Sequence, residues 1–114
     1  MLAACHSDVD PVAAAAESAR ERTLPSRGRL AAAEPLRRGD FWARAGWTIE
    51  TELAWADYAV WVVLRLSEYR VARRGGDRLV LTQRLDGDIY ILVLVAKQRS
   101  AGLQVEAAFQ AVPF

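Results

Sequence analysis

The chain has 114 residues, of which 53% are hydrophobic, and its formal net charge is +1. This length limits it to one domain at most, and the hydrophobic content is sufficient for a core. So small a net charge argues against sequence-independent nucleic-acid binding, which needs an excess of Lys and Arg on one face. One Cys excludes an internal disulfide, and one Cys with one His excludes a structural zinc site.

The first 39 residues are rich in Ala and contain no aromatic side chain. Asp8 or Asp10 can cap a helix, and Pro11 suits its first turn. We therefore predict a helix over 12–22. Proline, serine and glycine follow this segment and are expected to end the helix.

A second, short helical stretch is expected over 30–34, where Pro35 would end it. The helix over 12–22 has only a weak apolar stripe, so it would bury little area and would not be stable alone. We therefore interpret 1–39 as an Ala-rich, partly helical spacer. The folded β domain is predicted to comprise 40–114.

Residues 40–114 contain every Trp, Tyr and Phe of the chain, and their apolar pattern changes to a period of two. The pattern predicts strands over 47–55, 58–69, 78–85, 88–97 and 103–112. Asp86-Gly87 is a strong hairpin signal, because both residues tolerate the positive φ of a type I′ turn. The fold predicted is mainly β (α+β): a helical tether followed by a five-stranded antiparallel meander.

An alternative concerns the start of this region. Apolar residues at 42, 45, 49, 53, 56, 60 and 63 also fit one face of a helix. Strands are preferred, because Val-Trp-Val-Val at 60–63 is poor helix-forming material and the alternation over 47–55 is regular.

The strand predicted over 88–97 is apolar on both faces. Ile89, Ile91, Val93 and Val95 line one face, and the residues between them line the other. Both faces must therefore be covered. The cover could be the N-terminal helix, closure of the sheet, or another protein. Of these we favour a strongly curled sheet or small barrel that the N-terminal segment partly covers.

The chain begins Met1-Leu2-Ala3-Ala4-Cys5, and Leu-Ala-Ala-Cys resembles the lipobox of bacterial lipoproteins. The resemblance covers four residues and implies that Cys5 receives a diacylglycerol and becomes the mature N-terminus. A complete signal also has a basic segment and an apolar segment before the box, whereas only Met1 precedes Leu2 here. His6 follows Cys5 where an inner-membrane retention signal has Asp, so the resemblance implies an outer-membrane anchor facing the periplasm.

Four Trp lie within 20 residues, and Trp is a preferred anchor of protein interfaces. Trp47 and Trp55 share the apolar face of the first predicted strand, so we expect them in the core. Trp61 projects from the opposite face of the second strand, and Trp42 stands at the entrance to the β domain. Both are candidate binding residues, and Tyr90 of the fourth strand is a third.

Arginines surround the turn predicted at Gly75-Gly76. They are Arg70, Arg73, Arg74 and Arg78. A basic tip of this kind can bind a lipid phosphate, an anionic glycan or an acidic protein, and its alternative is an ordinary solvated turn. We include the four arginines among the candidate binding residues.

No group of residues supplies a nucleophile, a base and an orienting group together. His6, Ser7 and Asp8 are the residue types of a catalytic triad, but consecutive residues cannot adopt its geometry. Glu50 and Glu52 share a strand face and are interpreted as solvated. There is no glycine-rich phosphate loop. We therefore predict a protein that is not an enzyme and uses no cofactor or metal.

Together these features predict a non-enzymatic lipoprotein of the bacterial envelope. Its β domain would bind another protein, either part of a secretion or envelope machine or a toxin or hydrolase that it inhibits. One alternative is a small β barrel that holds a lipid or other apolar ligand. Another is a cytosolic subunit that dimerises through the second face of the sheet. A nucleic-acid partner is not expected.

Overall fold

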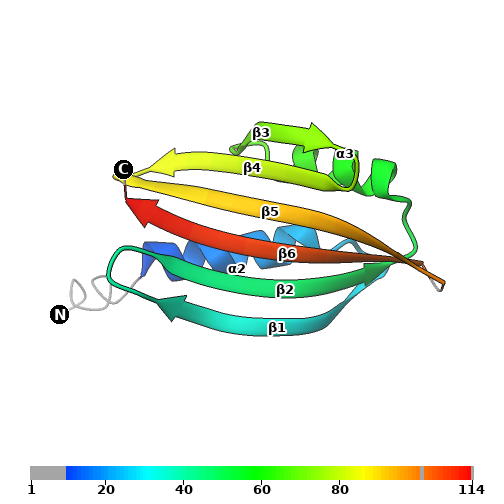
Figure 1. The fold of residues 1–114 in the computed structure, drawn as a ribbon, viewed down its shortest axis with the longest axis horizontal. Helices are drawn as coiled ribbons and strands as arrows, with labels where there is room; N and C mark the ends of the chain where they lie inside the picture. Colours follow the sequence, from blue (N-terminus) through cyan, green and yellow to red (C-terminus); the bar gives the residue numbers. More distant parts are fainter. Residues whose placement is uncertain (1–9, 101, 114) are drawn as a thin grey trace.

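The computed structural model describes residues 10–100 and 102–113 (Figure 1). Within them the helices are α2 (Pro11–Thr23) and α3 (Trp55–Arg65). The strands are β1 (Gly28–Arg38), β2 (Ala43–Thr51), β3 (Arg70–Gly75), β4 (Arg78–Leu85), β5 (Asp88–Arg99) and β6 (Gly102–Pro113). The mainly β, antiparallel character predicted from the sequence is confirmed.

All six strands form one antiparallel sheet in the order β1-β2-β6-β5-β4-β3. Only β3 to β6 form a meander, because β2 pairs with β6 and thereby brings the β1-β2 hairpin to the far end of the sheet. The prediction of five strands in a strongly curled sheet or small barrel is wrong. The sheet is open, since helices occupy the side that a barrel would enclose, and β1 and β3 remain its edges.

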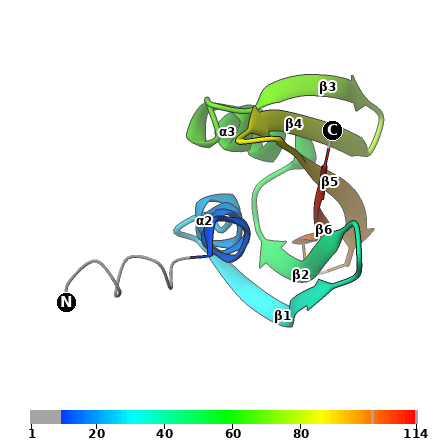
Figure 2. The ribbon, with the colours of Figure 1, turned by 90° about the vertical axis from the view of Figure 1, so that its left-hand side faces the viewer.

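Both helices lie on the same side of the sheet, which we call the inner face (Figure 2). The core lies between them and the inward residues of the strands. Its largest fully buried side chains are Tyr58, Tyr90, Phe109, Ile49, Leu66, Leu79, Leu81, Leu92, Leu94, Val62, Val105 and Thr23. These side chains fill the space that an apolar ligand would need inside a barrel.

A buried polar cluster joins both helices to the sheet. The Trp47 indole N–H of β2 donates to the Thr23 hydroxyl at 2.9 Å, and that hydroxyl donates to the carbonyl of Arg20 at 3.0 Å. The Tyr58 hydroxyl of α3 donates to the Thr23 carbonyl at 2.6 Å. Burial raises the pKa of Tyr58 far above its ordinary value, so the phenol stays protonated and donates.

Helix α2 begins as the sequence predicts. The Asp10 carboxylate caps it by accepting hydrogen bonds from the backbone N–H groups of Val12 and Ala13, at 3.0 and 3.3 Å. Pro11 occupies the first turn, where its missing N–H costs nothing. Asp10 also forms an ion pair with Arg38 at the end of β1, which ties the start of the helix to the edge of the sheet.

The Asp10–Arg38 contact is expected to make the stability of the protein depend on pH. The hydrogen bond from Arg38 holds the pKa of Asp10 below its ordinary value of 3.8. A lowered folded-state pKa adds stability above the unfolded-state pKa, and this is lost as the pH falls through the folded-state value. Wild type should therefore be more stable than Asp10→Asn, which can still cap the helix, and the difference should shrink on acidification. Urea unfolding from about pH 6 to about pH 2 checks this, and a pH-independent difference would contradict it.

Residues 28–38 form an edge strand and not the short helix expected over 30–34. Their partner is β2, and the ladder is interrupted by two register shifts, one of which spans Pro35 between Glu34 and Arg37. A proline is tolerated there because no regular ladder hydrogen bond is required of it. The boundary expected between 39 and 40 therefore falls in the connection of a β-hairpin, and the predicted spacer contributes α2 and β1 to the fold.

The second predicted strand, 58–69, is also wrong, because Trp55–Arg65 is helix α3. Its buried residues Tyr58, Ala59 and Val62 recur at helical spacing and face the core. Burial of this stripe outweighs the low helix propensity of the β-branched run. The alternative helical pattern gave the correct element for this segment but not the buried face, since its positions 56 and 60 are exposed. The earlier part of the pattern belongs to strand β2.

The turn predicted at Asp86-Gly87 is confirmed. Leu85 pairs with Asp88, and the two intervening residues have φ of 52° and 86°. Both values belong to the left-handed region that a type I′ hairpin requires, and this turn sets the register of β4 against β5.

Gly87→Ala is expected to lower the free energy of unfolding by about 1–2 kcal/mol, because an L side chain is strained at positive φ. The control is Gly75→Ala, where the φ is not left-handed and an added Cβ meets nothing within 4 Å. Urea unfolding of both variants checks the prediction. Equal effects at the two positions would show that the turn conformation is not responsible.

Candidate functional site

The side of the sheet away from both helices, which we call the outer face, carries a band of aliphatic side chains. Its members, called the apolar band below, are Val80, Ile89, Ile91, Val93, Val95, Ala108 and Val112. Ala108 is exposed and the others are half-buried. The row Val80-Val93-Ala108 crosses three neighbouring strands. The sequence predicted the aliphatic face of β5 correctly, and neither described helix covers it (Figure 2).

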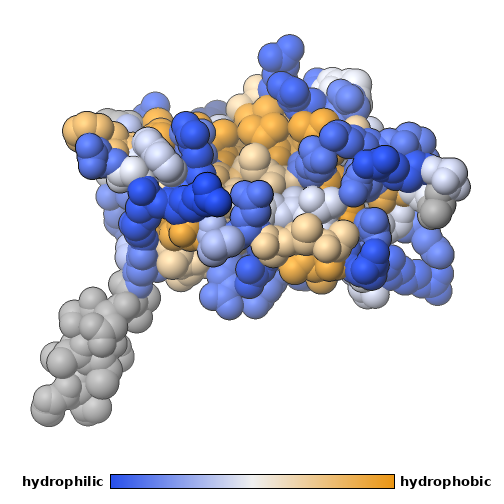
Figure 3. Space-filling model, turned by 60° about the horizontal axis from the view of Figure 1, so that its bottom comes forward, coloured by the Kyte–Doolittle hydropathy of each residue, from blue (hydrophilic) through white to orange (hydrophobic). Residues whose placement is uncertain are grey.

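Charged side chains, most of them cationic, surround the apolar band. By strand register, the cations on the outer face are Arg29, Arg37, Arg44, Arg70, Arg73, Arg78, Arg84, Lys97 and Arg99. The carboxylates on this face are Glu34, Glu50 and Glu106. Nine cations against three carboxylates give an excess of six positive charges on one face of a chain whose net charge is +1. Figure 3 looks obliquely at the molecule and shows apolar patches enclosed by hydrophilic atoms.

The arginines predicted as one basic cluster are divided between the two faces of the sheet. Arg70, Arg73 and Arg78 are on the outer face, beside Thr82, Val80 and Val95 respectively. Arg74 pairs with the buried Leu79 and therefore lies on the inner-face side. The separation follows from the two-residue period of β3, which places neighbouring residues on opposite faces.

The apolar band contains a shallow hollow of about 220 Å³. It lies where β2, β5 and β6 run side by side, and Ile91, Val93 and Ala108 contribute its aliphatic wall. Arg44 stands at its edge, with its guanidinium carbon 4.7 Å from the centre of the Trp42 ring. A cation beside an aliphatic hollow suits a partner side chain with an apolar stem and an acidic end.

Trp42 and Trp61, both predicted to bind, have different surroundings. Trp42 is 36% exposed beside the outer face and stacks against Arg44. Trp61 lies on α3, half-buried between the Tyr58 ring at 5.8 Å and the Arg65 guanidinium at 5.6 Å. Trp42 therefore adjoins the apolar band, and Trp61 does not.

Tyr90 is 1% exposed and cannot contact a partner from this position, so its place among the binding candidates was wrong. Its ring packs 5.7 Å from that of Phe109 on the inner face. Residues at even positions in β5 point inward, so Tyr90 is buried on the inner face together with Leu92 and Leu94.

A second apolar surface, not foreseen from the sequence, lies on α3. Val60 and Leu64 are 55% and 72% exposed, one helical turn apart, and we call this pair the α3 ridge. Val60 borders a hollow of about 320 Å³ between α3 and the β3-β4 turn. The strand prediction placed both residues on a buried face, whereas helical spacing turns them outward. The helical alternative placed Val60 on the apolar face of a helix, so neither pattern predicted that it would be exposed.

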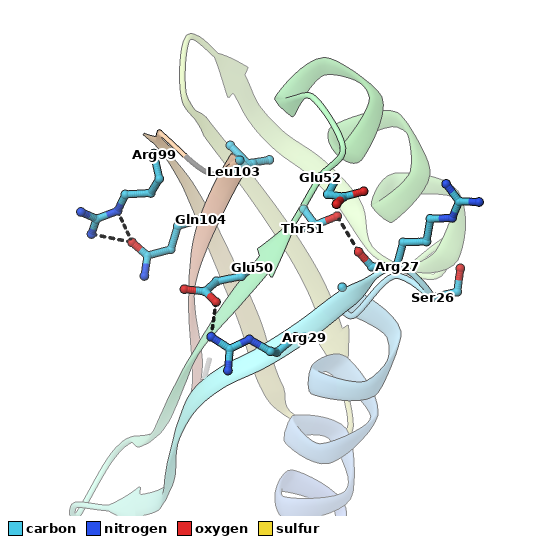
Figure 4. A pocket seen from close by; sticks show the side chains of 11 residues that line it. Ser26, Arg27, Arg29, Glu50, Thr51, Glu52, Arg99, Leu103 and Gln104 are labelled. Atoms are coloured by element: carbon cyan, nitrogen blue, oxygen red, sulfur yellow. Dashed lines mark hydrogen bonds and ion pairs between the residues drawn. The ribbon is translucent and has the colours of Figure 1, made fainter.

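A larger hollow of about 570 Å³ lies at the end of the sheet where β1 begins and β2 ends (Figure 4). Arg29 forms an ion pair with Glu50 there, and Arg99 donates two hydrogen bonds, of 2.9 and 2.7 Å, to the Gln104 side chain. These contacts occupy four of the polar side chains that line the hollow. The hollow is therefore a weaker candidate than the outer face.

Cys5, the predicted site of lipid attachment, lies outside the described residues, as does His6. In the described part of the chain, no group of three or more His, Cys, Asp and Glu side chains could hold a metal ion. Neither helix there is long and apolar enough to cross a membrane.

The outer face thus combines partly exposed aliphatic side chains with an excess of positive charge. Comparisons with protein-family models, curated proteins and solved structures gave no match.

Proposed function

We propose that the protein is a non-enzymatic component of the bacterial cell envelope whose folded domain binds another protein. In this proposal a lipid on Cys5 anchors the chain in the outer membrane, facing the periplasm. The observation that carries the binding function is the exposure of aliphatic side chains outside a core that is already filled. Such exposure is typical of an interaction surface.

Two features favour a protein partner over an apolar ligand. Tyr58, Tyr90 and Phe109 fill the inner side of the sheet, where an enclosed ligand would have to sit. The exposed apolar side chains stand on open surfaces, the outer face and the α3 ridge, and these suit the broad surface of another protein.

The anchor is tested by growing cells that produce the full-length gene product with a fatty-acid analogue. The expected result is a labelled protein, and no label on a Cys5→Ser variant. An unlabelled wild-type protein would refute the anchor and leave the binding function to be judged separately.

The binding function is tested with photo-reactive residues introduced singly at Val93 on the outer face and Leu64 on the α3 ridge. After irradiation of cells of the source organism, we expect an adduct to a second protein from at least one position. The absence of a protein adduct from both positions, in variants that remain folded, would refute the function.

A further inference from the structure

We infer that the outer face binds a protein whose docking surface is acidic around an apolar centre. This inference rests on the proposed protein-binding function, and it goes further by naming the surface and the chemistry of the partner. The apolar band would form the centre of the interface, and the cations around it would form the rim.

The charge of the outer face is the first argument. Two of its three carboxylates already have partners within the chain: Glu106 lies 3.0 Å from Lys97, and Glu50 pairs with Arg29. The excess of six positive charges therefore comes mainly from arginines such as Arg70, Arg73 and Arg78 at the β3-β4 end. Carboxylates on a partner would complement this field and bind the guanidinium groups in pairs of hydrogen bonds.

The composition of the apolar band is the second argument. It is made of Val, Ile and Ala side chains that interrupt the charged surface, and a protein interface has the same arrangement of apolar core and polar rim. The band contains no aromatic ring on which a nucleic-acid base could stack.

The edges of the sheet give a third argument, because they disfavour a partner that adds a strand. Edge strand β1 contains Pro35 and two register shifts. Edge strand β3 has six residues, three of them Arg, and a register shift between Val71 and Arg73. Shifts, prolines and charges of this kind block edge pairing in natural sheets. Docking on the face is the remaining way for this sheet to bind a broad surface.

A second copy of the chain is a poorer occupant than an acidic protein. Two outer faces packed against each other would bring two excesses of six positive charges together. Like charges across an interface oppose association. Self-association, nucleic-acid binding and membrane binding are therefore outcomes that the test must be able to reveal.

The test begins with the photo-reactive variants at Val93 and Leu64 in the full-length protein. We expect the photo-reactive residue at Val93 to form an adduct with a second protein, and the one at Leu64 to form none. Thermal unfolding verifies that each variant is folded. If the Val93 variant does not fold, the photo-reactive residue is introduced instead at Ala108, which pairs with Val93 and is exposed. The protein in the adduct is then identified and purified without the cross-link.

The second step measures the affinity of the purified pair. Arg73→Glu is expected to weaken binding by about tenfold, and further when combined with Arg78→Glu, because both reversals oppose an acidic surface. The matched control is Arg74→Glu, which makes the same charge change one residue away on the other face of β3, and it should alter the affinity by less than about twofold. Added salt should weaken the wild-type complex and narrow the difference between wild type and Arg73→Glu.

Each other outcome overturns the inference in a recognisable way. Adducts from Leu64 alone would keep the protein-binding function and refute the outer face as its site. An adduct from Val93 to a second copy of the chain, to lipid or to nucleic acid would show that this molecule, and not an acidic protein, occupies the outer face. Equal effects of Arg73→Glu and Arg74→Glu would show that net charge, and not the outer face, governs binding. No protein adduct from either position would refute the inference together with the proposed function.

Discussion

Leu92→Ala is expected to lower the free energy of unfolding by about 2–5 kcal/mol, the largest effect we predict for a single substitution. Leu92 is fully buried at the middle of the sheet, where β5 pairs with β4 through Leu81 and with β6 through Phe109. Removing three carbons there takes apolar area out of the core and leaves a cavity that the flanking strands cannot close.

Val93→Ala is the matched control, since Val93 is the next residue on the same strand and points to the outer face. It is half-buried, so its truncation should cost about 1 kcal/mol or less. Urea unfolding followed by circular dichroism measures both variants. A loss at Val93 as large as that at Leu92 would mean that the outer face is covered in the free protein, and it would also weaken the case for that face as a docking surface.

Thr23→Val is expected to lower the free energy of unfolding by about 1–3 kcal/mol, although the two side chains have nearly the same shape. The substitution leaves the buried Trp47 N–H without its acceptor and removes the hydrogen bond from the Thr23 hydroxyl to the Arg20 carbonyl. A buried N–H group without an acceptor destabilises the protein by more than its hydrogen bond stabilised it, because the group can no longer form a hydrogen bond with water either.

Thr82→Val tests whether the cost arises from the buried cluster. Thr82 is half-buried on the outer face, so the same chemical change there should alter stability by less than about 0.5 kcal/mol. A double-mutant cycle with Trp47→Phe adds a second check: the two losses should be less than additive, because the second change removes the donor that the first left unpaired. Additive losses would contradict the hydrogen bond as the cause.

The candidate site was partly foreseen. Alternation in 88–97 identified Ile89, Ile91, Val93 and Val95 as a face needing a cover, and that face is the centre of the outer face. The basic cluster around Gly75-Gly76 was foreseen as a group, but Arg74 lies on the other side of the sheet. The cations from β1 and β2 were not foreseen, because they reach the same face as β5 only through the pairing of β2 with β6.

The failures of secondary-structure prediction have one physical origin. Local propensity favours helix for 30–34 and strand for 58–69, and in each case the pairing or burial supplied by distant residues outweighs it. Residues 28–38 gain a ladder along β2, and Trp55–Arg65 gains a buried stripe against the core. Contacts formed across the chain contribute more free energy than the propensity of a few residues.

The sequence by itself determined the features that depend on neighbouring residues: the Asp10 cap, the Asp86-Gly87 turn, and the inward and outward faces of β4, β5 and β6. Each follows from the φ, hydrogen-bonding groups or two-residue period of a short segment. Only the tertiary structure decided that β2 lies beside β6, that the sheet stays open, and that nine cations share one face. These features depend on the order of the strands, which is chosen by burial across the whole chain.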